Sequence, residues 1–390
     1  MQNLVTSARQ IPAAETISAI RPYFEKFDIE GFIEHTPDGI DLIRSVEILR
    51  GNPRSGYLNL GKGFGIEAAL ASGYMEAIEM ATIEQPPKIE IIPLGDVNKD
   101  VPVYSAVTKA CSPAGSVASG NALRPVMRGV DLLTGAEICG FCAEYYLADH
   151  PSDSDEQIST NGLASGNSVA EARLHAVYEI IERHVGSRHF RGAGDVKRLD
   201  VRDAPPAFLQ AVAQIESLGG HCETFQLGRL FGVSVVQCTW VLERASEDPQ
   251  PRVNFGWGAH HSLAIAAARA VSEAVQAYAT RRACRNGAIP TGRMRGGRLI
   301  SAASLSHLAA DSTPAEEALA ARLRSCRAEP CDLGFDDELV SASPVELLDR
   351  IVSEMRHSGL SHLFSWTLLP SDYPFAVVRC CVPEFRSFGD

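Results

Sequence analysis

The sequence predicts a mixed α/β fold of the α+β kind. Long stretches with helical periodicity recur along the chain, and short runs rich in β-branched and aromatic residues lie between them. The two kinds of segment do not alternate regularly, so we do not expect a Rossmann-type parallel sheet. At 390 residues, of which 45% are hydrophobic, the chain can bury a sizeable core in one large domain or two ordinary ones.

The N-terminal part is expected to be mostly helical. Residues 14–46 have an amphipathic pattern, and residues 52–65 form a glycine-rich connection. This connection leads into a helix predicted over 66–84, which stops before Pro86 and Pro87 because proline cannot continue a helix.

Short strands and a second long helix follow. The helix is predicted over 168–185, where Ser168 and Glu171 have the spacing of a capping box. The segment before it, 151–167, is polar and contains glycine, so it is expected to be a loop. Strand-like runs precede this loop at 88–94, 101–107 and 136–147.

The second half of the chain mixes helix and strand. A third long helix is predicted over 263–283, again after a glycine-containing loop, at 254–262. Residues 243–252 are polar and are expected to form an exposed excursion, and no stretch is biased enough to be a disordered linker. The other expected elements are a helix within 204–220, strands at 222–228 and 233–242, helix pairs in the last hundred residues, and a closing strand at 375–382.

Charge and composition exclude several functional classes. The net charge of −12 and the pI near 5.4 argue against sequence-independent nucleic-acid binding. No apolar run is long enough for a membrane span, and the first residues do not resemble a secretion signal. The ten cysteines are scattered, and Cys139 and Cys142 form the only C-x-x-C pair. We therefore expect reduced thiols in a cytoplasmic protein, with a redox or metal site at this pair as the alternative.

The three long helices each carry a pair of acidic or amide side chains at positions i and i+3, with two apolar residues between them. Such a pair lies on one helix face, and two like charges there destabilise a helix by roughly 0.2–0.5 kcal/mol. One pair alone is readily explained as helix surface, but three copies beside apolar faces indicate a shared role. The pairs are Glu76 and Glu79, Glu179 and Glu182, and Glu273 and Gln276.

Clustered carboxylates usually surround divalent cations, and Mg²⁺ is typically bound by a few carboxylates together with nucleotide phosphates. The pattern therefore predicts a magnesium–nucleotide site built from three helices. Lys62, in the motif GKG, is a candidate phosphate ligand in a glycine-flanked loop, although the spacing of a P-loop is absent. Arg183 could neutralise a carboxylate or a phosphate. The arginine-rich segment 281–298 is either a solvated loop or a patch for phosphate or an acidic peptide.

These residues resemble the motifs of the YcaO family. In that family, an S-x-x-x-E-x-x-E-R helix, an E-x-x-E-R helix after an NGLA-x-G-N loop, and an R-A-L-x-E-x-x-Q helix bind Mg²⁺–ATP. The segments GKG at 61–63 and GVDLLTG at 129–135 also look like family signatures. The resemblance covers roughly residues 45–290 well and the last hundred residues weakly. It implies a YcaO-like fold with mixed sheets, in which several long helices carry the nucleotide site.

The resemblance also assigns residues, segments and cofactors. It implies an N-terminal helical segment over 1–45 and a YcaO domain over 46–390, with an ATP-binding core at about 55–290 and a helical and strand region at about 300–390. The catalytic residue is unknown. The implied ATP ligands are Lys62, Ser72, Glu76, Glu179, Arg183, Arg269, Gln276 and Arg285, and the implied Mg²⁺ ligands are Glu76, Glu79, Glu179, Glu182 and Glu273.

The implied activity is ATP-dependent phosphorylation of a peptide backbone amide oxygen. The layout resembles members that work beside a TfuA protein, and the chain ends EFRSFGD, whereas azoline-forming members typically end in Pro-x-Pro-x-Pro. Thioamide formation with a TfuA-like partner is therefore favoured, and an azoline-forming cyclodehydratase acting on Cys, Ser or Thr is the alternative. A separate leader-binding protein and a homodimer are further expectations, and nucleic acid and membrane are not expected partners.

Four positions depart from the family pattern. Two of them, Met80 and Tyr278, motivate a second alternative, a non-catalytic scaffold that binds nucleotide or peptide. The departing positions are Asn59, Met80, Tyr278 and Asn286-Gly287.

Overall fold

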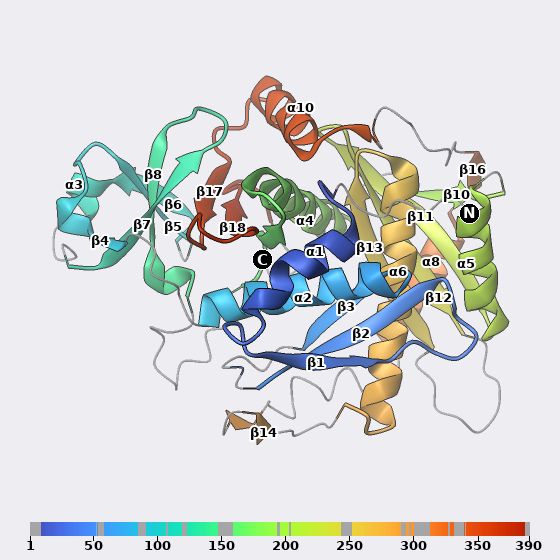
Figure 1. The fold of residues 1–390 in the computed structure, drawn as a ribbon. Coiled ribbons are helices and arrows are strands. Elements are labelled where there is room, and N and C mark those ends of the chain that lie inside the picture. Colours follow the sequence, from blue (N-terminus) through green and yellow to red (C-terminus); the bar gives the residue numbers. More distant parts are fainter. Residues whose placement is uncertain are drawn as a thin grey trace.

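A computed structural model confirms the predicted mixed α/β fold (Figure 1). Three sheets surround three long helices that meet near the centre of the molecule. In the view of Figure 1 a three-stranded sheet lies below, a five-stranded sheet to the right and an eight-stranded sheet to the left. The structure describes residues 9–386 except 52, 54–57, 85–90, 107, 119–122, 147–158, 193–195, 203, 243–251, 290–293, 296–297, 300–312, 327, 331–338 and 340.

The three-stranded sheet corrects the helical prediction for the N-terminal part. Helix α1 (Ala13–Ile20) and a 3₁₀ turn (Arg21–Tyr23) form as expected. They are followed by an antiparallel sheet of β1 (Ile29–Glu34), β2 (Ile43–Arg50) and β3 (Asn59–Phe64), so the helix expected up to residue 46 is wrong beyond α1. The reason is that β2 is buried on both faces, and such an apolar run cannot be told from a buried helix by its periodicity.

The eight-stranded sheet combines the middle of the chain with its end. Its order is β6-β5-β8-β7-β17-β18-β9, with β4 paired to β7, and the predicted closing strand forms as β18. Short helical turns at Leu94–Asp96, Ala114–Val117 and Cys142–Glu144 connect its strands. The strands are β4 (Ile91–Pro93), β5 (Pro102–Ser105), β6 (Ala110–Pro113), β7 (Pro125–Asp131), β8 (Glu137–Phe141), β9 (Leu163–Gly166), β17 (Phe364–Thr367) and β18 (Ala376–Cys381).

The five-stranded sheet has the order β13-β12-β11-β10-β16. Helix α5 (Pro206–Ser217) packs beside it, and α8 (Pro314–Arg324) and α10 (Pro344–His357) both begin with a complete capping box. A small hairpin pairs β14 (Met294–Arg295) with β15 (Arg298–Leu299). The strands of the main sheet are β10 (Lys197–Asp200), β11 (His221–Leu230), β12 (Val233–Val241), β13 (Val253–His260) and β16 (Ala328–Pro330).

The three predicted long helices are confirmed as α2 (Ile66–Glu84), α4 (Val169–Phe190) and α6 (Leu263–Arg285). The capping box of α4 is only half formed. The Ser168 hydroxyl accepts a hydrogen bond from the Glu171 N–H at 3.2 Å, but the Glu171 carboxylate accepts from the Gln10 N–H and from the Asn167 amide instead.

Each long helix follows directly after a strand, where the sequence predicted a glycine loop. The units are β3–α2, β9–α4 and β13–α6, and each helix contributes to a different hydrophobic core. Glycine in these strands serves close packing. A Cβ atom at Gly61 would lie 2.1 Å from the Ala69 carbonyl oxygen in α2, and one at Gly256 would lie 2.2 Å from the Ala270 carbonyl oxygen in α6. Glycine therefore lets the helix backbone approach its strand, and the loops predicted from these glycines are wrong.

We expect Gly61→Ala to destabilise the protein by about 1–3 kcal/mol or more, because the added methyl group meets backbone atoms that side-chain rotation cannot move. Urea unfolding monitored by circular dichroism measures this loss. Gly31→Ala in β1 is the matched control, since a Cβ atom there meets nothing within 4 Å. Equal stability of the two variants would contradict this account of the glycines.

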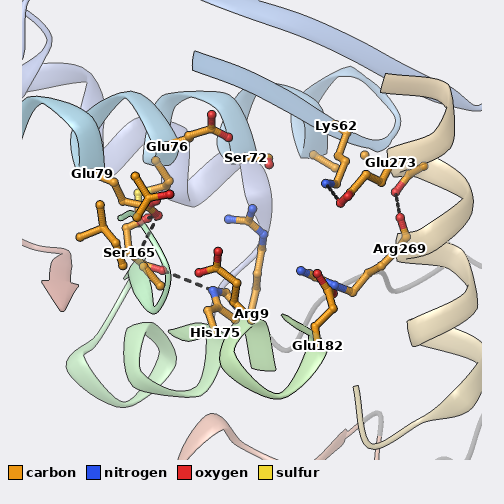
Figure 2. A pocket seen from close by; sticks show the side chains of 18 of the residues that line it. Arg9, Lys62, Ser72, Glu76, Glu79, Ser165, His175, Glu182, Arg269 and Glu273 are labelled. Carbon is orange, nitrogen blue, oxygen red and sulfur yellow. Dashed lines mark hydrogen bonds and ion pairs between the residues drawn. The ribbon is translucent and has the colours of Figure 1, made fainter. Parts of the chain in front are cut away.

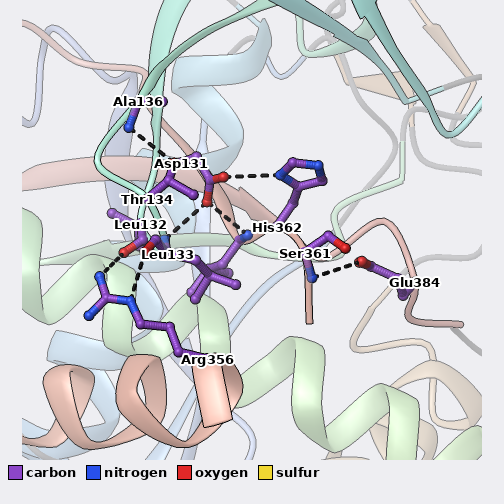
Figure 3. Close-up of polar contacts among 10 residues, drawn as sticks. Asp131, Leu132, Leu133, Thr134, Ala136, Arg356, Ser361, His362 and Glu384 are labelled. Carbon is purple, nitrogen blue, oxygen red and sulfur yellow. Dashed lines mark hydrogen bonds and ion pairs between the residues drawn. The ribbon is translucent and has the colours of Figure 1, made fainter. Parts of the chain in front are cut away.

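The GVDLLTG segment forms a junction in the eight-stranded sheet (Figure 3). The buried Asp131 carboxylate accepts hydrogen bonds from the backbone N–H groups of Leu133 and Leu363, at 3.0 and 3.2 Å, and contacts the His362 ring at 3.0 Å. Arg356 of α10 donates to the carbonyl oxygens of the same turn. This signature therefore joins the β7–β8 turn to α10 and β17.

Several expectations concern regions outside the described residues. They are residues 151–158 of the predicted loop, residues 243–251 of the excursion, and residues 290–293 and 296–297 of the arginine-rich segment. In the part of the chain that is described, no helix is long and apolar enough to cross a membrane, and all nine cysteines are free. Strand β2 runs across the predicted boundary between the segments 1–45 and 46–390, so both segments contribute to the three-stranded sheet. The division of the chain into domains stays a prediction.

Candidate functional site

The three acidic helices converge on one cavity of about 420 Å³ (Figure 2). Carboxylates from α2, α4 and α6 line it together with basic side chains. Nine of the eleven residues selected from the sequence lie on its wall, and Gln276 and Arg285, which the structure also describes, are not among the lining residues. The nine are Lys62, Ser72, Glu76, Glu79, Glu179, Glu182, Arg183, Arg269 and Glu273.

The strands that precede these helices are the edge strands of their sheets. β3, β9 and β13 each stand at one end of the strand order. The Glu76 carboxylate accepts a hydrogen bond from the Leu60 N–H of β3 at 3.2 Å. Glu79 accepts from both the N–H and the hydroxyl of Ser165 in β9, at 2.7 and 2.6 Å. The carboxylates therefore satisfy backbone donors that a sheet edge would otherwise leave open.

The second acidic pair differs in its partners. Glu179 accepts a hydrogen bond from the Gly162 N–H at 3.1 Å and pairs with Arg183 at 2.6 Å. Glu182 makes no hydrogen bond or ion pair to any residue that the structure describes. On α6, Glu273 pairs with Lys62, which places the lysine in strand β3 and not in the predicted loop. This pair joins two of the three strand–helix units.

No sequence pattern identifies Arg9, because this residue stands in the N-terminal segment outside every motif. Figure 2 shows its side chain reaching into the cavity. Ser165 and His175 also line the cavity, and the His175 Nδ1 atom lies 3.3 Å from the Ser165 carbonyl oxygen. Both belong to segments quoted for their glutamates, so their side chains could have been identified from the same two motifs. Burial, together with Arg269 and Arg9, lowers the pKa of His175 to about 3, so its ring is neutral.

Burial raises the pKa of three cavity carboxylates. The pKa is raised to about 7 for Glu76 and to about 8 for Glu79 and Glu182. Neighbouring carboxylates add to the rise at each position, while hydrogen bonds or the charges of Lys62 and Arg269 oppose it. Without a cation among them, these groups hold protons near neutral pH.

This donor set fits Mg²⁺. Carboxylate oxygens are the ligands that Mg²⁺ prefers, and a bound cation would remove the repulsion that raises these pKa values. Among the described residues, no three His, Cys, Asp or Glu side chains are close enough to hold a metal ion by themselves. Such spacing suits an ion that phosphate oxygens help to bind.

The raised pKa values predict a stability that falls with pH. Above about pH 6.5 an unfolded chain has ionised its glutamates, which titrate near 4.5, while the folded chain still holds protons on Glu76, Glu79 and Glu182. The folded state thus binds more protons, and the free energy of unfolding decreases from about pH 6.5 to 8. The buried histidines have lowered pKa values in the folded state and titrate near 6.5 in the unfolded state, so they oppose this trend mainly below about pH 7.

Thermal melting in a chelating buffer tests this prediction. We expect the melting temperature to fall from about pH 6.5 to 8, and Mg²⁺ with a nucleotide to restore more stability at the higher pH. Glu182→Gln should make the melting temperature less dependent on pH, because the amide does not titrate. A melting temperature that rises over this range would contradict the assignment of protons to these carboxylates.

Two departures from the family pattern have structural explanations. Tyr278 is buried in the core beneath α6 and packs on Trp240 with ring centroids 4.4 Å apart. Asn286 is the C-cap residue of α6. Met80 lines the cavity, so it is the departure that bears directly on the site.

Comparison with protein families agrees with the cavity. The model of the YcaO cyclodehydratases, described as binding ATP and Mg²⁺, matches residues 60–386. The chain belongs to the YcaO family. Membership confirms the predicted family and, at the level of the family, the predicted cofactors ATP and Mg²⁺.

Three similar proteins share between 15% and 30% of their aligned residues with this YcaO protein. An uncharacterised protein in the tfuA 3′ region of Rhizobium leguminosarum bv. trifolii is 30% identical over 186 residues, which cover 45% of this chain and 42% of that protein. The match therefore spans less than half of that relative. YcaO of Methanopyrus kandleri, solved with AMPPCP and Mg²⁺, aligns over 100% of this chain and 96% of its own, with a TM-score of 0.70 and 22% identity. A heterocyclase in complex with substrate and cofactor aligns over 100% of this chain and 54% of its own, with a TM-score of 0.68 and 15% identity. These likenesses confirm the fold.

Proposed function

We propose that this YcaO protein uses ATP to phosphorylate a backbone amide oxygen in a ribosomally made peptide or protein. The observation that carries the proposal is the convergence of six carboxylates and three cationic side chains from separate strand–helix units on one cavity. Ordinary helix surface would leave these pairs facing solvent in different directions. Phosphoryl transfer depends mainly on positioning and charge stabilisation, which is what such a set of side chains provides.

The residues take the following roles in this proposal. When bound, Mg²⁺–ATP supplies the phosphoryl group. Glu76, Glu79, Glu179, Glu182 and Glu273 hold the metal, and Lys62, Ser72, Arg183 and Arg269 face the nucleotide with the shared glutamates. Gln276 and Arg285 stay predicted nucleotide ligands. Lys62 and Arg183 already pair with Glu273 and Glu179, so each can exchange its carboxylate for a phosphate oxygen once a metal neutralises that carboxylate.

The reaction conserves atoms as follows. A nucleophile adds to the amide carbon, the carbonyl electron pair moves to the oxygen, and this oxygen takes the phosphoryl group as ADP leaves. The carbon–oxygen bond then breaks and phosphate leaves with the former amide oxygen. If the nucleophile is a sulfide equivalent, the carbon keeps the sulfur as a thioamide. If it is a neighbouring Cys, Ser or Thr side chain, the amide nitrogen loses its proton and an azoline ring results.

We favour the thioamide product with a TfuA-like partner that delivers sulfur. This branch is supported by the relative encoded beside tfuA and by the overall layout of the chain. Azoline formation is the second candidate, supported by the cyclodehydratase description of the family and by the heterocyclase likeness. The catalytic group that activates the nucleophile stays unassigned. A cytoplasmic location, a leader-binding protein and a homodimer stay predictions.

Product mass separates these possibilities. The protein is incubated with ATP, Mg²⁺, a TfuA-like protein, sulfide and a candidate substrate peptide, and the peptide is analysed by mass spectrometry. We expect a gain in mass from exchange of oxygen for sulfur. Loss of one water would identify an azoline. Nucleotide binding without consumption of ATP, with all components present, would instead identify a non-catalytic scaffold.

A further inference from the structure

Three buried hydrogen-bond donors beside the cavity have no acceptor in the part of the chain that the structure describes. They are the Arg379 guanidinium at Nη1, the Tyr145 hydroxyl and the Trp366 indole N–H. The three side chains are 6%, 1% and 0% exposed. We call these three residues the donor cluster. Arg379 forms no hydrogen bond or ion pair within the described residues, and its guanidinium lies 5.8 Å from the centroid of the Tyr145 ring.

Strand register places the donor cluster next to the cavity. Arg379 of β18 is paired with Trp366 of β17 on one side and with Leu163 of β9 on the other. Residues paired across antiparallel strands project from the same face of the sheet, with Cβ atoms about 5 Å apart. Leu163 lines the cavity, so Arg379 lies directly behind the cavity wall. Burial lowers the pKa of Arg379, and the negative charge of Glu179 is among the influences that oppose this.

The surroundings of the donor cluster are aromatic, and Arg379 is its one cationic member. The Trp366 ring lies 5.0 Å from the Tyr145 ring and 6.1 Å from the Tyr104 ring, measured between centroids. Phe364 packs against both Tyr104 and Trp366. A phosphate dianion would need more than one cation in such an apolar setting. A neutral, polarised oxygen, such as the carbonyl oxygen of an amide, would need only hydrogen-bond donors.

Leaving these donors without acceptors is energetically unfavourable. A buried donor that loses its partner destabilises a protein by about 1–3 kcal/mol, and a buried unpaired charge by more. Native proteins usually satisfy such groups, and the exceptions gather where a ligand or ordered water belongs. Three neighbouring donors that find no acceptor among the described residues point to an oxygen ligand.

We propose that the donor cluster binds the carbonyl oxygen of the peptide amide that is phosphorylated. Arg379 and Tyr145 donate to this oxygen as its negative charge grows during attack on the carbon, which is the role of an oxyanion hole. The peptide reaches the cluster from the cavity, beside Leu163 and Glu179. This inference rests on the proposed function and extends it to the position of the second substrate.

The indole signals of the three tryptophans offer a direct test, because Trp366 belongs to the cluster and Trp240 and Trp257 do not. The whole protein is labelled with ¹⁵N at the indole nitrogens, and Trp366→Phe assigns the signal. N-acetylglycine N-methylamide, a minimal blocked backbone amide, is then titrated in the presence of Mg²⁺ and AMPPCP. We expect the Trp366 signal alone to shift. In Tyr145→Phe and Arg379→Gln the dissociation constant of the amide should rise at least about tenfold.

Tyr146→Phe provides a matched control, since Tyr146 is equally buried but its hydroxyl donates to the Leu368 carbonyl oxygen at 3.3 Å. The two variants should show opposite effects. Tyr146→Phe loses a satisfied hydrogen bond and should lower the melting temperature while leaving amide binding unchanged. Tyr145→Phe removes a hydroxyl without a partner and should weaken amide binding while leaving the melting temperature unchanged or higher.

Several outcomes would overturn the inference. An unmoved Trp366 signal would mean that the cluster holds only water, and a shift caused by inorganic phosphate but not by the amide would identify an anion site. Weaker binding of Mg²⁺–AMPPCP to Tyr145→Phe, measured by calorimetry, would assign the cluster to the nucleotide. If the wild-type protein binds no nucleotide at all, the proposed function fails, whereas the amide titration without nucleotide still tests the cluster.

Discussion

Replacing Glu182 by glutamine is expected to reduce Mg²⁺–ATP-dependent turnover by at least about 100-fold while the protein stays folded. Glu182 lies in the cavity and makes no hydrogen bond or ion pair to the described residues, so the amide removes a metal ligand without breaking a contact within the protein. Burial raises the pKa of Glu182 to about 8, so the neutral side chain should also stabilise the metal-free protein above that pH. Release of ADP and melting in a chelating buffer measure the two effects.

Glu67→Gln is the matched control for this substitution. Glu67 stands in the first turn of α2, is exposed, and does not line the cavity. Its replacement should leave both turnover and melting nearly unchanged. Wild-type turnover in Glu182→Gln would remove the metal site from the proposed function. Loss of turnover together with loss of structure would show that Glu182 supports the fold instead.

Glu84→Gln is expected to lower the free energy of unfolding by about 3 kcal/mol or more. Glu84 ends α2 and pairs with Arg50 at the end of β2, with 2.6 Å between nitrogen and oxygen, and both side chains are 0% exposed. The substitution leaves the Arg50 charge buried without its counter-charge, which is far less favourable than losing an exposed pair. Urea unfolding gives the value.

A surface ion pair supplies the comparison. Arg128 and Glu137 pair across β7 and β8 with both side chains about half exposed. Glu137→Gln should change the free energy of unfolding by less than about 1 kcal/mol. Equal effects at the two sites would mean that burial does not decide the contribution of the Arg50–Glu84 pair.

The long helices and the acidic cavity could be predicted from the sequence. The bounds of α2 follow from its continuous helix-forming residues and the prolines beyond them, and the acidic pairs stood out because each repeated one spacing beside apolar residues. Their convergence followed from electrostatics, since three such pairs without a cation would be unfavourable. The family motifs then identified Ser72 and Arg269, which line the same cavity.

Other features depended on tertiary contacts that no local pattern reveals. β3 and β13 were misread as loops because their glycines serve contact with a helix that follows later in the chain. The helix predicted over β2 is wrong because burial on both faces of this strand removes the alternation typical of a strand. Arg9 reaches the cavity from the N-terminal segment, and the donor cluster joins residues from β17, β18 and the turn after β8, so neither has a sequence spacing to detect.

The hydrogen bonds between edge strands and cavity glutamates have a practical consequence for making inactive variants. Glu76 and Glu79 occupy the positions where a foreign strand would otherwise join β3 or β9. Alanine at either position would remove the metal ligand and also expose a template for aggregation, whereas glutamine keeps an oxygen that accepts the same N–H group. Precipitation of an alanine variant would therefore reflect the exposed edge of β3 or β9, and it would not show whether the glutamate is needed for the reaction.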